Sequence, residues 1–541
     1  MWKLWSGRRD RLGLALLGVA VLSTGLSVLS LLTDSVRGTV VRSYEQTWRS
    51  PYDILVHMPL SGAPLGDLTE PNILTTLPQG ITQAQLEEVR KVPGVEVAAP
   101  VAVVGYVRAG PSYLFPSADL PHPGGGVYRI TSEVSATDSL VPETMREEYL
   151  VALADPRTGK LPAQVPDGAL VLDKGQLQSL VISAQIPTLL VGIDPDAEEQ
   201  LVGLNQALTE GRSLRAADAV DFRPSGRGPI PVIPVLVNTF GLQGMTYRLT
   251  IEEVDAEGRA RRQVAEQTLA GDALLAAVAE GEVGIHRVYG QSGPLTYAPV
   301  QSPFPDRWPH AFAMRPVSAD LERSLSDGGP LSPRSSVTAA TPVRPWTPDA
   351  ADKLFYYSIR GYFDSSRLSI AKDPSSQLPL MTYRPAEALL VLDGDLTPVN
   401  PPRRIRGSLS PTGFLSSPPA LLTTLEAARA LAGDNAINAI QVKVANADHF
   451  TPEVVARVHA VAAEIQRRTG LVAEVTMGSS PMNVLVQVPG ERPGEVAGWV
   501  EMPWVHKDAA VTAVQQVEFG YSGYVALVLI VGALYALTTA L

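Results

Sequence analysis

The predicted fold depends on residues 12–32, LGLALLGVAVLSTGLSVLSLL. These 21 residues carry no charged side chain, and as a helix they cover about 31 Å, enough to cross a bilayer core. Residues 521–541, YSGYVALVLIVGALYALTTAL, form a second uncharged stretch of the same length. Basic residues flank a span on its cytoplasmic side, and four precede the first stretch: Lys3, Arg8, Arg9 and Arg11. We therefore expect transmembrane helices at 12–32 and 521–541, with residues 1–11 in the cytoplasm and a large domain outside it.

The composition excludes several classes of protein. Of the 541 residues, 45% are hydrophobic and 18% are charged, which is too apolar for a disordered chain. The absence of Cys excludes disulfides, thiolate metal sites and a cysteine nucleophile. Residues 34–520 hold 40 Lys and Arg against 54 Asp and Glu, a net charge of −14. This acidic balance argues against nucleic-acid binding, because phosphate contacts need clustered Lys and Arg.

A stalk helix is expected next to each span. Between residues 33 and 50, apolar side chains recur every four positions, a spacing that places them on one helix face: Val36, Val40, Tyr44 and Trp48. Pro51 ends this helix. A second stalk is expected at 509–520. The alternative for both stripes is ordinary packing against the domain between them.

Residues 52–108 have the pattern of a β-α-β-β unit. A strand is predicted at 52–56, and a helix follows whose N-cap is Thr82, with Gln85 completing a capping box. This helix stops before Pro93, and the valine-rich stretch 95–107 returns as strand.

A similar unit recurs near the other end of the chain. Strand 439–444 precedes a helix with Thr451 as N-cap and Pro452 at its first position. Strands are predicted at 471–476 and 484–488. The two units share a pattern without residue identity, and we expect such distant segments to build one subdomain. The predicted fold class is thus an α+β extracytoplasmic domain, residues 51–508, between two transmembrane α-helices.

The middle of the chain is less regular. Strands are predicted at 230–237 and 247–254 and a short helix at 272–280. Two stretches rich in Pro, Ser and Gly, 323–351 and 395–420, are interpreted as long surface loops or an inserted flexible region.

The acidic run from Asp194 to Glu199 has two interpretations. Its carboxylates could form a Ca²⁺ site, but Asp194 as N-cap and Pro195 as first helical residue explain the run better, since acids favour a helix N-terminus.

The search for catalytic, cofactor-binding and metal-ligating residues ends without a candidate. Gly159-Lys160 lacks the rest of a phosphate-binding loop. Glu453 follows His449 by four residues, but the helix is expected to begin only after His449, so a shared metal site is disfavoured. The pair Ser369 and Lys372 matches S-x-x-K without the partner motifs S-D-N and K-T-G.

Several segments together resemble bacterial ABC transporter permeases of the FtsX/MacB type, which carry a MacB-like core domain between their first two spans. The matching segments occur in order along the chain: 48–56 (WRSPYDILV), 80–82 with 93–95 and 99–101, 192–198 (GIDPDAE) with 201–204 and 211–212, then 468–471, 478–481 and 498–507. The stretches 323–351 and 395–420 lie outside the resemblance.

The resemblance implies a permease subunit without an active site or cofactor of its own. In this family a homodimer or heterodimer of permeases pairs with a cytoplasmic ATPase, which binds ATP in a separate subunit. Stalk helices relay nucleotide-driven movement to the outer domain. The implied location is the bacterial inner membrane, as a multi-pass protein.

This chain departs from the family, whose permeases have four spans. We therefore carry two expectations. The first is a permease subunit, or the N-terminal part of one with its second span cut short, of an ATP-driven ABC transporter or mechanotransmission complex in the bacterial envelope. The second is a non-transporting, membrane-anchored extracytoplasmic binding or scaffold module. A third hypothesis, an extracytoplasmic hydrolase, rests on Ser369 and Lys372 alone. The substrate or client is not predicted.

Overall fold

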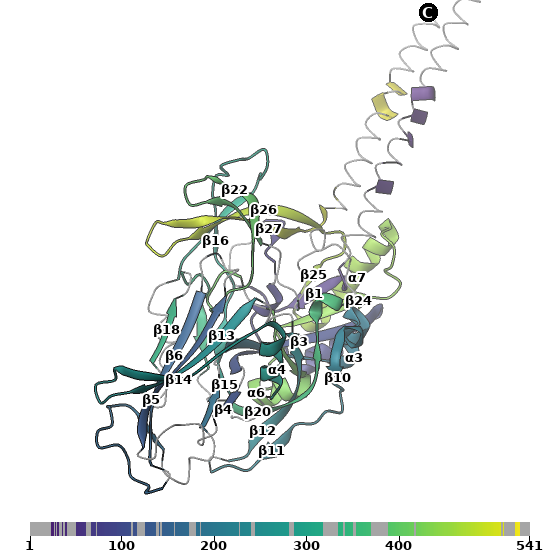
Figure 1. Cartoon of the computed structure of the whole chain (residues 1–541). Coiled ribbons are helices and arrows are strands. Elements are labelled where there is room, and N and C mark those ends of the chain that lie inside the picture. Colours follow the sequence, from purple (N-terminus) through teal and green to yellow (C-terminus); the bar gives the residue numbers. More distant parts are fainter. Residues whose placement is uncertain are drawn as a thin grey trace, which may run out of the picture.

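The computed structural model describes residues 50–509 apart from several gaps, the longest being 116–124, 318–333 and 369–382, together with isolated positions within 23–39 and 512–530. The described strands form a 12-stranded, a 7-stranded and a 6-stranded sheet, and a separate pair, β4 (Ser112–Phe115) with β8 (Leu180–Ser183). Figure 1 shows the 7-stranded sheet at the top, above the other two. Five described helices of 8 to 18 residues within 50–509 are few beside these sheets.

The predicted fold class is wrong. The chain between residues 50 and 509 is mainly β-sheet where it is described, not an α+β domain of two β-α-β-β units. The β-α-β-β patterns that suggested α+β cover only its two ends, whereas residues 126–136, 143–153 and 260–270 between them also form long strands, none of which was predicted.

No described helix is long and apolar enough to cross a membrane. The segments 12–32 and 521–541, and the stalks expected at 33–50 and 509–520, lie outside the described residues except for isolated positions. The absence of a membrane-spanning helix among the described residues contradicts two predictions drawn from the resemblance. The inner-membrane, multi-pass location and the membrane-permease description are both wrong.

The two ends of the domain interlock in one part of the large sheet. The order is β3 (Val95–Ala109), β24 (Ala439–Val444), β1 (Ile54–His57) and β25 (Val472–Val475). All three pairings are antiparallel. A shared subdomain is confirmed, but β1 pairs with two strands of the distant segment and not with β3.

Two helices pack against these strands and bury a common apolar cluster. They are α2 (Gln83–Arg90) and α7 (Pro452–Thr469). Thr82 and Gln85 form the predicted capping box, and Thr451 caps α7 with Pro452 at its first position. Buried side chains of both helices meet the strands: Leu86, Val89, Val454, Val458, Val461 and Ile465. Local rules for helix N-termini are confirmed at both places.

The large sheet continues beyond β3 in the order β9-β23-β12-β20-β15-β19, with β10 beside β20 and β11 beside β12. These strands are β9 (Ile186–Ile193), β10 (Leu208–Gly211), β11 (Asp221–Arg223), β12 (Ile230–Asn238), β15 (His286–Ser292), β19 (Trp346–Pro348), β20 (Leu354–Phe363) and β23 (Leu421–Thr424). Two short helices, α3 (Pro195–Val202) and α6 (Leu425–Ala432), contact this sheet, as do the 3-10 turns Ile73–Thr75, Leu204–Ala207 and Ser365–Arg367 near its ends.

The 6-stranded sheet has the order β14-β13-β5-β6-β18, with β7 beside β6. Its strands are β5 (Gly126–Ala136), β6 (Glu143–Leu153), β7 (Leu170–Leu172), β13 (Met245–Val254), β14 (Ala260–Ala270) and β18 (Arg334–Thr338). Helix α4 (Gly271–Glu280) follows β14. The strands predicted at 230–237 and 247–254 and the helix at 272–280 are confirmed by β12, β13 and α4.

The 7-stranded sheet has the order β16-β17-β26-β27-β21-β22, with β2 beside β27. Its strands are β2 (Leu68–Thr69), β16 (Tyr297–Pro299), β17 (Ala311–Met314), β21 (Ala388–Asp393), β22 (Pro398–Ile405), β26 (Ser480–Pro489) and β27 (Val496–His506). Alternate residues bury opposite faces, as the two-residue period of a strand requires. Val500, Met502 and Trp504 of β27 join a large cluster on the inner face. Trp499 joins a smaller one on the outer face.

The stretches 323–351 and 395–420 differ from the surface loops that were predicted. They contain β18, β19 and β22 where described, and Trp346, Phe414 and Leu415 are buried. Proline and glycine suggested loops there, but strand edges also accept proline.

Candidate binding site

A compact loop, Pro303-Phe304-Pro305-Asp306-Arg307-Trp308, covers the outer face of the 7-stranded sheet just before β17. The backbone N–H groups of Arg307 and Trp308 donate to the carbonyl oxygen of Phe304 at 3.1 and 2.9 Å. The Phe304 N–H donates to Oγ of the buried Ser302 at 3.3 Å. Two prolines restrict the backbone further. The sequence thus folds into one tight turn, which we call the cap loop.

Trp308 anchors the cap loop to the sheet. Its side chain is only 3% exposed and packs with Ala311, Val391, Leu392, Leu485 and Trp499. The indole Nε1 donates to Oε2 of Glu501 at 2.6 Å. Because a buried indole N–H needs an acceptor, Glu501 on β27 fixes both the position and the orientation of this ring.

Glu501 also balances the charge of the cap loop. Its Oε2 lies 3.6 Å from the guanidinium of Arg307, and its Oε1 accepts a hydrogen bond from Nδ2 of Asn483 at 3.0 Å. The Arg307 guanidinium lies 4.2 Å from the Trp308 ring centre, a cation–π distance. The positive charge of Arg307 is therefore matched within the fold.

A groove of about 680 Å³ lies between the cap loop and strands β21 and β22. Most of its lining is apolar: Pro303, Phe304, Pro305, Trp308, Val391, Leu392, Pro398, Val399 and Pro402, with Asp306, Arg307 and Asn400 as the polar members. The Phe304 ring meets Trp308 edge to face at 6.2 Å and stays 43% exposed. Concave apolar surfaces of this size with a few polar groups are typical of binding sites.

The outer edge of the groove is β22, the last strand of its sheet among the described residues. It pairs with β21 on one side. Pro398, Pro401 and Pro402 have no N–H group, so β22 cannot offer a continuous ladder to an added strand. A partner therefore cannot add to β22 as a regular strand.

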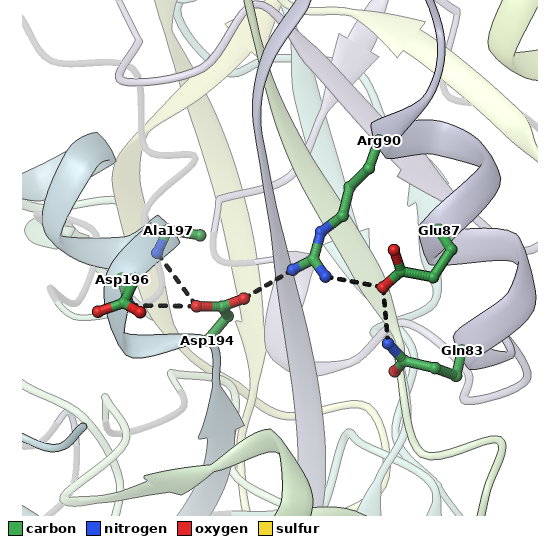
Figure 2. A network of polar contacts seen from close by, with 6 residues as sticks. All are labelled: Gln83, Glu87, Arg90, Asp194, Asp196 and Ala197. Atoms are coloured by element: carbon green, nitrogen blue, oxygen red, sulfur yellow. Dashed lines mark hydrogen bonds and ion pairs between the residues drawn. The ribbon is translucent and has the colours of Figure 1, made fainter. Parts of the chain in front are cut away.

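The acidic run from Asp194 to Glu199 forms a helix N-terminus, as its preferred interpretation predicted. Asp194 Oδ1 accepts from the N–H groups of Asp196 and Ala197 at 3.1 and 3.2 Å, while its Oδ2 accepts from Arg90 at 2.6 Å. Figure 2 shows the Arg90 guanidinium between Asp194 and Glu87, linking the start of α3 to α2. These oxygens serve a helix cap and an ion pair, so the Ca²⁺ alternative receives no support.

The remaining motif residues belong to separate parts of the chain. His449 precedes α7 and Glu453 lies in its first turn. Gly159 and Lys160 belong to a turn closed by Asp155. Ser369 and Lys372 lie outside the described residues. Within the described part of the chain, no three His, Asp or Glu side chains are grouped as a metal site would require.

A buried acid that the sequence did not single out is Glu198 on α3. Its side chain is 1% exposed, and Oε2 has no hydrogen-bond donor. Burial raises the pKa of Glu198 to about 7, partly offset by the Tyr383 phenol and increased by the negative charge of Asp194. Glu198 is buried near Tyr52 and Tyr383, which belong to one apolar core cluster. It is a titrating core residue away from the groove.

A second buried acid, Glu70, lies under the 7-stranded sheet. Burial raises its pKa, an effect opposed by Arg344 and by the hydrogen bond from Tyr297, whose hydroxyl lies 2.9 Å from Oε2. Arg344 is 4% exposed and donates to the carbonyl oxygens of Gly413 and Phe414. This network joins segments distant in sequence and opens onto no described pocket.

Comparison with protein-family models, with curated proteins and with solved structures finds no match for this chain. The groove is therefore the basis of the functional proposal. Sequence reasoning missed it because the cap loop carries no catalytic motif and because β22 was assigned to a loop. The available signal was a run of Pro, Phe and Trp directly before a strand.

Proposed function

We propose that this chain is a binding module that holds an apolar segment of a partner protein in the groove beneath the cap loop. The observation that carries the proposal is the exposed Phe304 ring over an apolar groove of about 680 Å³. Groove walls held by the Trp308–Glu501 hydrogen bond support it further, because a preformed site loses little conformational entropy on binding.

A binding role suits the polar groups that line the groove. They are one carboxylate, one guanidinium and one amide, and none of them is a serine, cysteine or histidine that could act as an activated nucleophile or its base. Of the two main hypotheses from the sequence, the proposal retains the binding module and omits the membrane anchor. The cytoplasmic ATPase partner stays a prediction of the resemblance.

Peptide selection tests the proposal. A phage-displayed library of random peptides of about twelve residues, long enough to fill such a groove, is selected on the full chain and counter-selected on Phe304→Asp. We expect peptides with Trp, Phe or Leu anchors whose affinity falls at least about tenfold in the variant, because its carboxylate must lose water on binding.

Phe222→Asp is the matched control. Phe222 is another exposed phenylalanine, 60% accessible on β11 of the large sheet, so its substitution changes surface chemistry and net charge equally without touching the groove. It should leave the affinity of the selected peptides unchanged. Peptides that bind both variants and the parent equally, or a library that yields no binder, would contradict the proposed function.

A further inference from the structure

The groove has one charged group that the fold does not neutralise. Arg307 and Glu501 balance each other across 3.6 Å. Asp306, in the same turn, is exposed and lines the groove without an ion pair or hydrogen bond among the described residues. An unmatched carboxylate beside an apolar surface favours a ligand with a positive charge at that end.

The backbone edge beside Asp306 has the same preference. The prolines of β22 lack an N–H donor but keep their carbonyl oxygens, which only accept hydrogen bonds. Ligand groups that donate several hydrogen bonds, such as ammonium and guanidinium, complement both Asp306 and these carbonyl groups.

The basic residues of β22 do not line the groove. Arg403 and Arg404 directly follow Pro402. Arg403 donates to the carbonyl oxygen of Leu140 at 3.0 Å, and Arg404 has an interaction of its own within the fold. The chain as a whole carries a net charge of −11, which adds a long-range attraction for cationic partners.

We infer that the occupant of the groove is a basic, apolar segment of a partner protein, an inference that rests on the proposed function. An aromatic or aliphatic anchor of this segment packs against Phe304, and a Lys or Arg next to the anchor pairs with Asp306. Extended strand addition is excluded as the binding mode by the prolines of β22. The anchor supplies affinity through buried area, and the charge supplies selectivity and faster association.

The test uses three labelled peptides that share one Trp- and Leu-containing centre and carry flanks of Lys, Gln or Glu. Their affinity for the full chain is measured by fluorescence anisotropy at low and at high salt. We expect the order Lys above Gln above Glu, with about two- to fivefold between neighbours, the value of one partly exposed ion pair. High salt should reduce the differences, because it screens exposed charges.

Asp306→Asn should remove the preference for Lys over Gln while the Gln peptide binds as before. The control Asp167→Asn, on the loop before β7, changes the net charge equally at an exposed site outside the groove, and it should keep the preference. Equal affinity of all three peptides, or preference for the Glu peptide, would overturn the inference.

The two proposals fail in different ways. If binding depends on Phe304 but not on flank charge, the groove binds apolar partners and only the basic character is refuted. If none of the three peptides binds, and Phe304→Asp changes nothing, the proposed function itself fails.

Discussion

Glu198→Gln should stabilise the protein at alkaline pH and not at acidic pH. The wild-type carboxyl is 1% exposed in an apolar core, with Tyr52, Tyr383 and the carboxylate of Asp194 as the facing titratable groups. Asp194 is itself paired with Arg90. No cation faces Glu198 among the residues that perturb it, so its ionised form is uncompensated. Glutamine keeps the shape and stays neutral at every pH.

The magnitude follows from the pKa. Burial raises it from 4.5 to about 7. Because the folded state holds this proton more tightly than the unfolded state, the favourable contribution is fully present below about 4.5 and is lost as the pH rises through about 7. A shift of that size corresponds to about 3 kcal/mol of unfolding free energy.

The assay is urea unfolding, followed by circular dichroism, of wild type and Glu198→Gln from about pH 5 to about pH 8. The informative quantity is the difference between the two free energies of unfolding, since other titrating groups cancel in it. It should move in favour of the variant by about 3 kcal/mol over this range. Glu426→Gln, an exposed acid in the first turn of α6, is the matched control and should show no comparable change. A difference that stays constant with pH for Glu198→Gln would refute the reasoning.

Three further substitutions test the packing. Gly192→Ala should lower the unfolding free energy by about 1–3 kcal/mol, because the new Cβ would overlap that of Ala428 on α6; an unchanged urea midpoint would disprove the close approach of α6 to β9. Asn438→Ala should cost about 2–3 kcal/mol in the same assay, since the Asn438 amide accepts from the Val103 N–H at 2.7 Å and is buried; a loss under about 0.5 kcal/mol would show that water replaces it. Glu501→Ala leaves the Trp308 N–H without its acceptor. It should destabilise the chain by about 1–3 kcal/mol and lower the affinity of groove-binding peptides in anisotropy titrations. Full peptide affinity would show that the cap loop stays in place without Glu501.

Local structure could be predicted well from the sequence. The N-caps at Thr82, Asp194 and Thr451 are confirmed with their hydrogen bonds, because a cap depends on residues within one helical turn. Strand 439–444 is confirmed to the residue, since its apolar and polar residues alternate with the two-residue period of a strand.

Strand pairing could not be predicted in the same way. The sequence placed β1 and β3 in one β-α-β-β unit without a pairing, and in the sheet β24, more than 300 residues away, lies between them. Backbone hydrogen bonds are nearly the same for any two strands, so which strands become neighbours depends on how all buried faces pack at once.

The groove depends even more on tertiary structure. Trp308, Glu501 and Pro398 are far apart in sequence, and only the order β17-β26-β27-β21-β22 brings them to one surface. A catalytic motif can be recognised along the chain because its spacing carries the chemistry. An apolar groove has no such spacing, since any apolar residues of suitable size can line it.

The amino-acid sequence by itself determined where helices begin, where several strands run, and that the chain is apolar, acidic and without cysteine. Those properties depend on neighbouring residues or on composition. The three-dimensional structure alone decided that β-sheet dominates between residues 50 and 509, that the two ends of this domain share one sheet, and that the unpaired Asp306 lies beside an apolar groove. Each of these results from contacts between residues far apart in the chain, whose free energy no local pattern contains.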